Sequence, residues 1–489
     1  MDHGVTEKRG YDAVGKDNSD GDVIAPHVSN SVVFGEVLNE NGRSDVEKQK
    51  IQQGDAHFHR LGWKRLTVVL IVEAIALGSL GLPSAFATLG MVAGVILCIG
   101  IGLIAIYACY IIGQVSLKYP GVAHYADIGR LMWGGFGYNL FSVIFISQLT
   151  LVVGSHCLTG TIAFNNITQS DVCSVVFGIV SAIILLLLAI PPSFAEVAIL
   201  GYIDCASIGL AILITMIATG IQGAQAPGGL AASTWSAWPK EDLKFSEAFI
   251  AVNSIVFAYA FASAQPSFMQ EMHTPKDYIK STWSVMVIQI VVYTLTGAII
   301  YAFVGQEVQS PALLSAGPVV SRIVFGIALP VIFISGSINT TIVCRYIHGK
   351  IYEDSVVRYV NTKKGWITWL GLVTIITFLA WIIAEAIPIF SELLSISASL
   401  FVSGLSFYFP PVMWFLLLKE GKWYAKENIR SAIYNGIVFL FGVIVLVAGT
   451  YATVAELVSF EVIKCRYLAL TALQITTFKS GSVGKPFSC

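Results

Sequence analysis

The residue types best suited to chemistry lie where the first apolar stretch is interrupted. Glu73 precedes the run Gly78, Ser79, Leu80, Gly81, Leu82 and Pro83. Pro83 removes a backbone donor and the glycines permit non-helical backbone, so we expect two half-helices joined by an unwound stretch near 78–82. Amides at the start of the second half-helix carry partial positive charge, which suits a carboxylate. The motif therefore predicts that residues 78–82 bind a substrate carboxylate.

The sixth apolar stretch carries a similar interruption, in which Tyr259, Ala260 and Phe261 come shortly before Pro266. Irregular backbone at membrane depth is tolerated where it lines a cavity, and broken helices in matching places of two halves indicate an inverted-repeat transporter. We expect Tyr259 and Phe261 to wall an apolar side chain of the substrate, while carbonyls near 259–262 meet its ammonium group. A pair of simple kinks is the competing interpretation, because Pro and Gly are frequent in membrane helices.

Other polar residues lie inside apolar stretches, where they are costly and tend to be functional. Glu73, Asp204 and His156 are candidates for carrying a coupling proton, because carboxyls hold protons and an imidazole titrates near neutral pH. Ser335 and Asn339 belong to a polar run in the eighth stretch and are candidates for binding the substrate or a cation. Structural hydrogen bonding between helices is the alternative for each of these residues.

The composition requires a membrane to position these residues. Of the 489 residues, 59 are charged, and 20 of those charges lie in the first 65 residues. The other 424 residues carry 39 charges, about 9%, against roughly 25% in a soluble domain. A soluble enzyme is therefore excluded, and the net charge of −1 argues against binding to nucleic acid. We expect an all-α polytopic membrane protein without a cofactor, because the sequence shows no metal-ligand spacing and no phosphate-binding loop.

Apolar stretches long enough for a bilayer core of ~30 Å recur to residue 458. They predict eleven transmembrane helices, with one repeat of five over 66–220, a second over 246–418, one extra helix and a short interfacial helix within 119–137. The predicted spans are 66–90, 91–117, 136–164, 172–190, 194–220, 246–268, 281–304, 318–343, 366–386, 388–418 and 430–458.

The distribution of Lys and Arg predicts the orientation. An N-terminus in the cytoplasm places 13 basic residues at cytoplasmic loops and span margins and 3 on the opposite side. Asn166 then begins a glycosylation sequon in the external loop after span three. Residues 1–60 and 459–489 are predicted as tails, the first of them disordered and cytoplasmic. That tail is either inert or regulated by a kinase or by a ubiquitin ligase acting on its lysines, which are Lys8, Lys16, Lys48 and Lys50.

Several motifs resemble the amino acid/auxin permease family of the APC superfamily. The run from Gly78 to Gly90 is similar to the family's first-helix signature, and Phe257 to Tyr259 with the loop through Lys276 resembles its sixth helix. Glu73 and the closing run Gly484 to Cys489 are most similar to the fungal neutral amino acid permeases of the N-system, methyltryptophan-resistance type. The resemblance spans residues 60–458. It implies a five-plus-five inverted repeat with one extra helix and the uptake of neutral amino acids, aliphatic and aromatic, driven by an ion gradient.

One departure from the family bears on the coupling ion. Sodium-coupled relatives carry an Asn in the first helix that helps to hold the ion, and no Asn lies between Arg65 and the break here. The resemblance therefore implies proton symport across the plasma membrane. Alternatives are a vacuolar exporter of the same family and a sensor that binds amino acids without transporting them. A membrane-embedded enzyme is disfavoured, because its nearest candidate pair, His124 and Asp127, lies in a loop without a catalytic partner.

Overall fold

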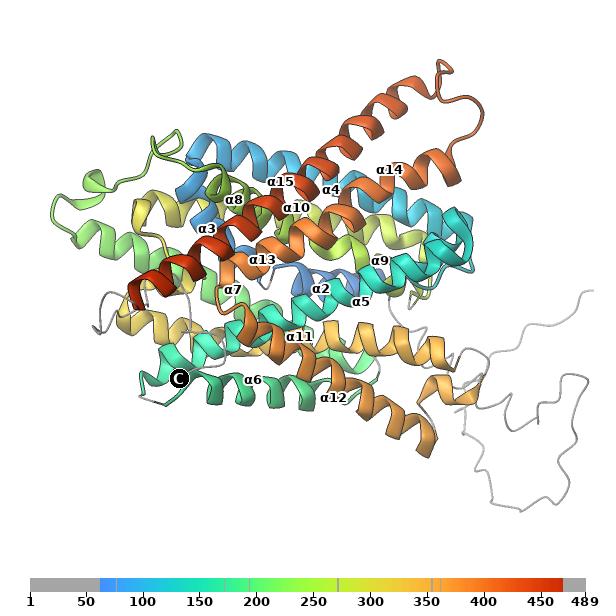
Figure 1. The fold of residues 1–489 in the computed structure, drawn as a ribbon, viewed down its shortest axis with the longest axis horizontal. Helices are drawn as coiled ribbons and strands as arrows, with labels where there is room; N and C mark the ends of the chain where they lie inside the picture. The colour runs from blue at the N-terminus through green and yellow to red at the C-terminus, as the bar shows by residue number, and fades with distance from the viewer. Residues whose placement is uncertain are drawn as a thin grey trace, which may run out of the picture. The chain divides into compact units, whose positions relative to one another are not determined.

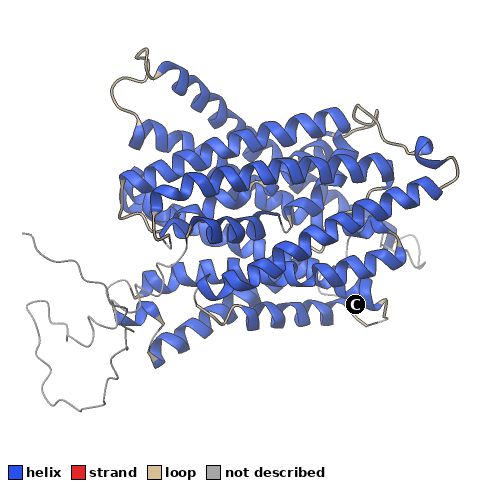
Figure 2. Ribbon diagram, turned by 180° about the vertical axis from the view of Figure 1, so that it is seen from behind, coloured by secondary structure: helices blue, strands red, loops and turns tan. Residues whose placement is uncertain are grey.

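The computed structural model describes residues 62–75, 77–170, 172–192, 194–270, 272–352, 355–360 and 362–468. Within these residues the chain is helical and contains no strand (Figures 1 and 2). The tail lysines and the closing run 484–489 lie outside the described residues. Glu73 belongs to the second helix, but its side chain also lies outside the described part. The predictions made for those residues stay predictions.

The first repeat contains five helical segments, of which the first is interrupted. Their bounds are α2 (Trp63–Ile75) with α3 (Gly78–Leu89), α4 (Met91–Lys118), α5 (Tyr125–Thr168), α6 (Ser174–Leu188) and α7 (Phe194–Gln225). The short 3₁₀ turn η1 (Gly229–Ala232) follows. Every predicted span of this half coincides with one of these segments.

The second repeat also begins with an interrupted helix. Its segments are α8 (Phe245–Ala258), the 3₁₀ turn η2 (Ala260–Ala264) and α9 (Gln265–Gln270), then η3 (Pro275–Asp277), α10 (Tyr278–Val304), η4 (Gly305–Glu307), η5 (Ala312–Ala316), α11 (Pro318–Ile351), η6 (Val356–Tyr359) and α12 (Lys363–Ala386). The last span combines α13 (Phe390–Ser397), the π-helix η7 (Ala398–Tyr408), α14 (Phe409–Met413) and the π-helix η8 (Trp414–Leu418). The extra helix is α15 (Ile429–Leu468), which continues ten residues beyond the predicted end at 458.

Corresponding helices of the two repeats pack against each other. The first helices meet through α3 and α8, the second through α4 and α10, the third through α5 and α11, and the fourth through α6 and α12. Helix α15 covers α8 and the π-helix η7 (Figure 1). The described residues therefore form the predicted all-α arrangement, with five plus five helical segments and one extra. Within the described residues, eight of these helices are long and apolar enough to cross a membrane, and the bent α8–α9 pair makes a ninth.

Apolar side chains on the outside of the bundle explain why it needs lipid. Helix α15 exposes Ile437, Val447 and Tyr451 at 60%, 64% and 66%. Polar side chains such as Gln148 and Asn339 are buried instead, at 1% and 0% exposure. Large apolar surfaces of this kind are rare on soluble monomers and suit hydrocarbon.

Helix α5 begins with the predicted interfacial segment and then kinks. Trp133 and Gly134 depart from helical geometry, and Gly134 has a φ of 61°, which a glycine adopts without strain. The predicted start of span three at residue 136 lies just after this kink. At the other end, α5 continues to Thr168, four residues past the predicted end. The predicted loop position of Asn166 is therefore wrong, because this residue lies in the last helical turn and its Oδ1 accepts a hydrogen bond from Ser321 at 3.1 Å. Glycosylation of Asn166 stays a prediction.

Candidate functional site

The first helix is broken, but not where the Gly and Pro residues were expected to unwind it. Helix α2 ends at Ile75 and α3 begins at Gly78, so Gly78 to Leu89 are helical, with Pro83 inside α3. The expectation of an unwound stretch at 78–82 is therefore wrong. The Leu80 N–H donates to the Leu77 carbonyl at 3.1 Å, which closes the first turn of α3. Ser79 uses its hydroxyl to bond the Ile75 carbonyl at 2.7 Å, back across the break.

The glycine at the break serves close packing. A Cβ on Gly78 would lie 2.8 Å from the Ala258 Cα, at the end of α8, so the two interrupted helices meet at their breaks. A Cβ on Gly81 would lie 3.2 Å from Cδ1 of Leu394 on α13. Small residues of this kind let helix backbones approach each other in membranes. The sequence analysis assigned these glycines to an unwound stretch, whereas the structure places them at close contacts between helices.

A tyrosine from α10 connects the ends of the two first half-helices. The Tyr293 hydroxyl lies within hydrogen-bond distance of the Ala74 carbonyl of α2 and 3.0 Å from the Ala258 carbonyl of α8. Carbonyls at a helix C-terminus lack intrahelical donors, so a buried hydroxyl placed between two such carbonyls stabilises both breaks. The sequence analysis missed Tyr293, because a single Tyr in an apolar span carries no signal of this contact.

The second break is a bend of 43° between α8 and the segment that contains η2 and α9. Tyr259 caps α8 and is fully buried, and its hydroxyl donates to the Cys98 carbonyl on α4 at 2.9 Å. The hydroxyl therefore points toward α4, and Tyr259 is not among the residues that line the central cavity. The expected wall position of Tyr259 is wrong, whereas Ala260 and Phe261 do line this cavity.

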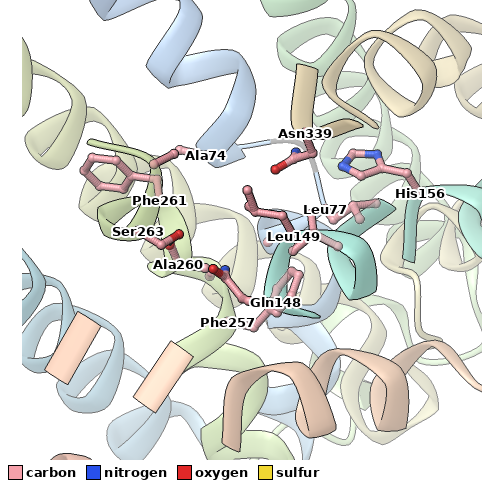
Figure 3. A pocket seen from close by; sticks show the side chains of 14 residues that line it. Ala74, Leu77, Gln148, Leu149, His156, Phe257, Ala260, Phe261, Ser263 and Asn339 are labelled. Carbon is pink, nitrogen blue, oxygen red and sulfur yellow. The ribbon is translucent and has the colours of Figure 1, made fainter. Parts of the chain in front are cut away.

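A small central cavity lies between the two breaks (Figure 3). Its volume of about 30 Å³ holds one or two water molecules, so an amino acid would enter only if the lining side chains move. In Figure 3 Phe261 and Ser263 lie on one side of the cavity and Asn339 and His156 on the other. The lining is formed by Ala74, Leu77, Gly78, Gln148, Leu149, Val152, His156, Phe257, Ala258, Ala260, Phe261, Ser263, Ala264 and Asn339.

Polar groups of the cavity come mainly from α5 and α11. Gln148 and His156 lie two turns apart on α5, and Asn339 faces them from α11. The Asn339 side-chain amide donates to the Ser335 carbonyl at 3.1 Å, and the Ser335 hydroxyl lies 3.4 Å from His156 Nε2. Gln148 Oε1 and Asn339 Oδ1 are buried and have no hydrogen-bond partner among the described residues. Buried acceptors without a donor are costly, so they suit a ligand that brings donors.

The remaining predicted residues divide by position. Five of them line the cavity, namely Gly78, Ala260, Phe261, His156 and Asn339. Ser335 does not line it, but its hydroxyl contacts His156. The set Ser79, Leu80, Gly81 and Leu82 lies in α3 away from the lining. Asp204 is fully buried in α7 and also does not line the cavity. Gln148 was missed, although a Gln inside an otherwise apolar span is a signal that a sequence reading can use.

Both ends of the path through the cavity are closed. At the end of the bundle that holds the C-terminus of α3, called here the α3 end, Leu394 packs on Gly81. At the opposite end, called the α9 end, Gln270 donates to the Val122 carbonyl at 3.0 Å and His124 Nδ1 lies 3.0 Å from the Ser267 hydroxyl. Each end of the bundle is therefore held by contacts between helices of the two repeats.

The pair His124 and Asp127 forms a helix cap. Asp127 Oδ2 accepts from the backbone N–H groups of Ala123 and His124 at 3.0 and 2.9 Å, which is a capping box at the start of α5. Burial, with the positive charges of Arg345 and Arg358, lowers the pKa of His124 to about 3. This imidazole is neutral at physiological pH. Its contact with the Ser267 hydroxyl connects α9 to the start of α5.

Two repeats of five helices, whose broken first helices meet around a closed cavity, define a membrane transporter. The chain belongs to the family described as transmembrane amino acid transporter protein, whose family model matches residues 59–455. This confirms the resemblance inferred from the motifs.

Curated relatives cover nearly the whole chain. It is 56% identical to the "N amino acid transport system protein" of Neurospora crassa over 96% of this chain and 97% of that one. It is 26% identical to a "Transmembrane transporter" of Fusarium pseudograminearum, over 88% and 87% of the two chains. A solved structure of a nucleobase-cation-symport-1 family transporter in a closed conformation has a TM-score of 0.44 at 14% identity and covers 87% of this chain and 96% of that one. The fold described above rests on the helices of this chain alone.

Proposed function

We propose that this chain imports neutral amino acids, aliphatic and aromatic, by proton symport with alternating access. The observation that carries the proposal is the cavity between the two helix breaks. Its described lining combines four buried polar residues with apolar and aromatic side chains and contains no Asp, Glu, Lys or Arg. A substrate with a charged side chain would need a counter-charge there, whereas a neutral side chain needs only apolar walls. The name of the Neurospora crassa relative supports transport of amino acids.

The geometry suggests how the zwitterion is held. Its carboxylate would meet the first-turn amides of α3 at Gly78, where the helix dipole favours negative charge. Its ammonium would donate to Gln148 Oε1 and Asn339 Oδ1, which lack partners among the described residues. Phe257, Phe261 and Leu149 would surround the side chain. Both charged groups would then be paired, as burial requires.

Alternating access follows from the two closed ends. The α3 end is closed by apolar contact at Gly81, and the α9 end by two polar contacts to α9. Opening one end while the other stays closed would expose the cavity to one side of the membrane at a time. With the proposed orientation, the N-terminus is cytoplasmic and the α3 end faces outward. The plasma membrane is the proposed location, and the vacuolar membrane is the alternative.

Of the three candidate proton carriers, His156 has the most direct link to the substrate. It lines the cavity and lies 3.4 Å from the Ser335 hydroxyl, whose residue also accepts the bond from Asn339. Glu73 precedes Ala74, which lines the cavity, and we retain it as a carrier on its position in the chain. Asp204 lies outside the lining and is the weakest of the three.

Uptake of radiolabelled leucine and phenylalanine into cells that express the chain tests this proposal. We expect uptake at about pH 5 to exceed uptake at about pH 7.5, to ignore sodium, and to stop with a protonophore. Glu73→Gln and His156→Gln are compared for loss of accumulation with retained exchange, which marks the proton carrier. Gln148→Met and Asn339→Leu should raise KM, while Gln169→Met, just past the end of α5, is the matched control. Surface expression without uptake would refute import.

A further inference from the structure

A second cavity lies at the α3 end of the bundle, outside the closed central one. It has a volume of about 310 Å³ and is much larger than the central cavity. It is lined by parts of α3, α8, α13 and α15 and by the segments before α8 and before η5, namely Ser84, Ala85, Thr88, Lys240, Glu247, Ile250, Ala251, Ser254, Val308, Gln309, Ser310, Ser391, Glu392 and Glu456. The central site uses none of these residues.

The charged groups of this outer cavity include both signs. Lys240 Nζ lies 2.6 Å from Glu247 Oε2. Glu392 accepts from the Ser391 hydroxyl at 2.8 Å, and Glu456 accepts from the Ser246 hydroxyl at 3.0 Å, in each case at Oε2. Three carboxylates therefore face one ammonium group, which leaves an excess of negative charge next to a positive group. A zwitterion matches this pattern, with its ammonium on the carboxylates and its carboxylate beside Lys240.

The hydroxyl group of Ser310 is an independent indication of a ligand. Ser310 lines the outer cavity and is 8% exposed, and its Oγ has no hydrogen-bond partner among the described residues. A buried polar atom without a partner is costly, and a bound polar molecule would supply the missing bond.

The outer cavity also lies on the path to the central one. Ser84 follows Gly78 by six residues on α3, about 9 Å at 1.5 Å per residue. Gly81, which packs on Leu394, lies halfway between them. On the facing helix, Ser254 lines the outer cavity and Phe257 the inner one. The same two helices therefore connect both cavities, with one apolar closure between them.

We propose that the outer cavity is a waiting site that binds a zwitterionic amino acid before it passes Gly81. The proposal rests on the proposed uptake function. Glu392 and Glu456 receive the ammonium group, Lys240 attracts the carboxylate, and Ser310 completes the hydrogen bonding. The substrate then moves about two helical turns inward when α13 leaves α3.

Uptake kinetics of radiolabelled leucine test the waiting site in the full chain. We expect Glu392→Gln and Glu456→Gln to raise KM about tenfold, which corresponds to about 1.4 kcal/mol, with Vmax and surface expression unchanged. Glu392→Asp keeps the charge and should restore KM. Glu307→Gln, an exposed acid in η4 that lies outside both cavities, is the matched control and should leave KM unchanged.

The waiting site would be refuted if the Gln variants left KM unchanged, or if Glu392→Asp failed to restore KM. It would also be refuted if the Gln variants lost Vmax and shifted the pH optimum of uptake, because the carboxylates would then belong to the proton path. If the wild type shows no uptake, the proposed function fails and the waiting site is tested by binding alone. The purified chain should then hold two leucine molecules at saturation, and Glu392→Gln should weaken the binding of the second molecule about tenfold. One molecule in both proteins would refute the site.

Discussion

The two ends of the proposed transport path are held by different kinds of contact. At the α3 end, Leu394 packs on Gly81 through apolar contact, next to the large, charged outer cavity. At the α9 end, Gln270 and Ser267 are fastened to Val122 and His124 by polar contacts. Apolar contact is non-directional and adapts to small shifts, whereas a hydrogen bond breaks once its geometry is lost. The contact at Gly81 itself is therefore apolar, whereas the contacts at Gln270 and Ser267 are polar.

Substitution at the meeting point of the two breaks should have the largest effect, because both ends depend on it. Gly78→Ala places a Cβ 2.8 Å from the Ala258 backbone, which has no flexible side chain to move away. We expect loss of transport and a stability loss of about 1–3 kcal/mol, as for other overpacked cores. Uptake and thermal unfolding of the purified protein measure both. Gly100→Ala on α4, where nothing lies within 4 Å, is the control and should be neutral.

Removing the hydroxyl that serves both breaks should have the next largest effect. Tyr293→Phe keeps the buried ring but deprives the Ala74 and Ala258 carbonyls of their shared donor. We expect a loss of about 1–3 kcal/mol in stability and a fall in Vmax of at least tenfold. Tyr301→Phe, on the same helix and equally buried, removes a hydroxyl far from the breaks and serves as the comparison. Equal Vmax in Tyr293→Phe and the wild type would show that the breaks do not need this bridge.

Loosening only the α9 end should have a moderate effect. Gln270→Ala removes the bond to the Val122 carbonyl, so the inward-open form becomes easier to reach. We expect exchange of preloaded leucine to rise about twofold to tenfold, because a net hydrogen bond is worth about 0.5–1.5 kcal/mol and 1.4 kcal/mol corresponds to a factor of about ten. Gln306→Ala at the α3 end is a matched control whose exchange rate should stay at the wild-type level. A gain of the same size in both variants would remove the distinction between the two ends.

The pH response should change least when His124 is replaced. Its pKa is lowered to about 3, so the folded protein keeps it neutral from pH 5 to pH 8 and it adds nothing to the acid activation of uptake. In the unfolded chain the pKa of His124 is about 6.5. Below that pH the unfolded chain binds a proton at His124 and the folded chain does not, so the free energy of unfolding decreases as the pH falls. His124→Gln should therefore keep the pH profile of uptake and lose less thermal stability between about pH 7 and about pH 5. A flattened uptake profile would instead make His124 the proton carrier.

Sequence information was sufficient for the fold but not for the site. Apolar length and the paired interruptions predicted eleven spans and two broken helices, because burial of backbone in lipid leaves a chain few alternatives. The same residues misplaced the first break, since a glycine that permits unwinding and a glycine that permits contact look identical in one dimension. Gly78 and Gly81 proved to be the second kind.

The class of protein and the residue types at membrane depth can be read from the amino-acid sequence. Few charges, long apolar stretches and motifs of the amino acid transporter family follow from composition and local order. Tertiary structure alone decided which of those residues share a cavity. Gln148, His156 and Asn339 meet because α5 and α11 pack side by side, whereas Tyr259 turns away because its hydroxyl finds the Cys98 carbonyl. These contacts join residues more than 150 positions apart, and no local pattern encodes a partner at that distance.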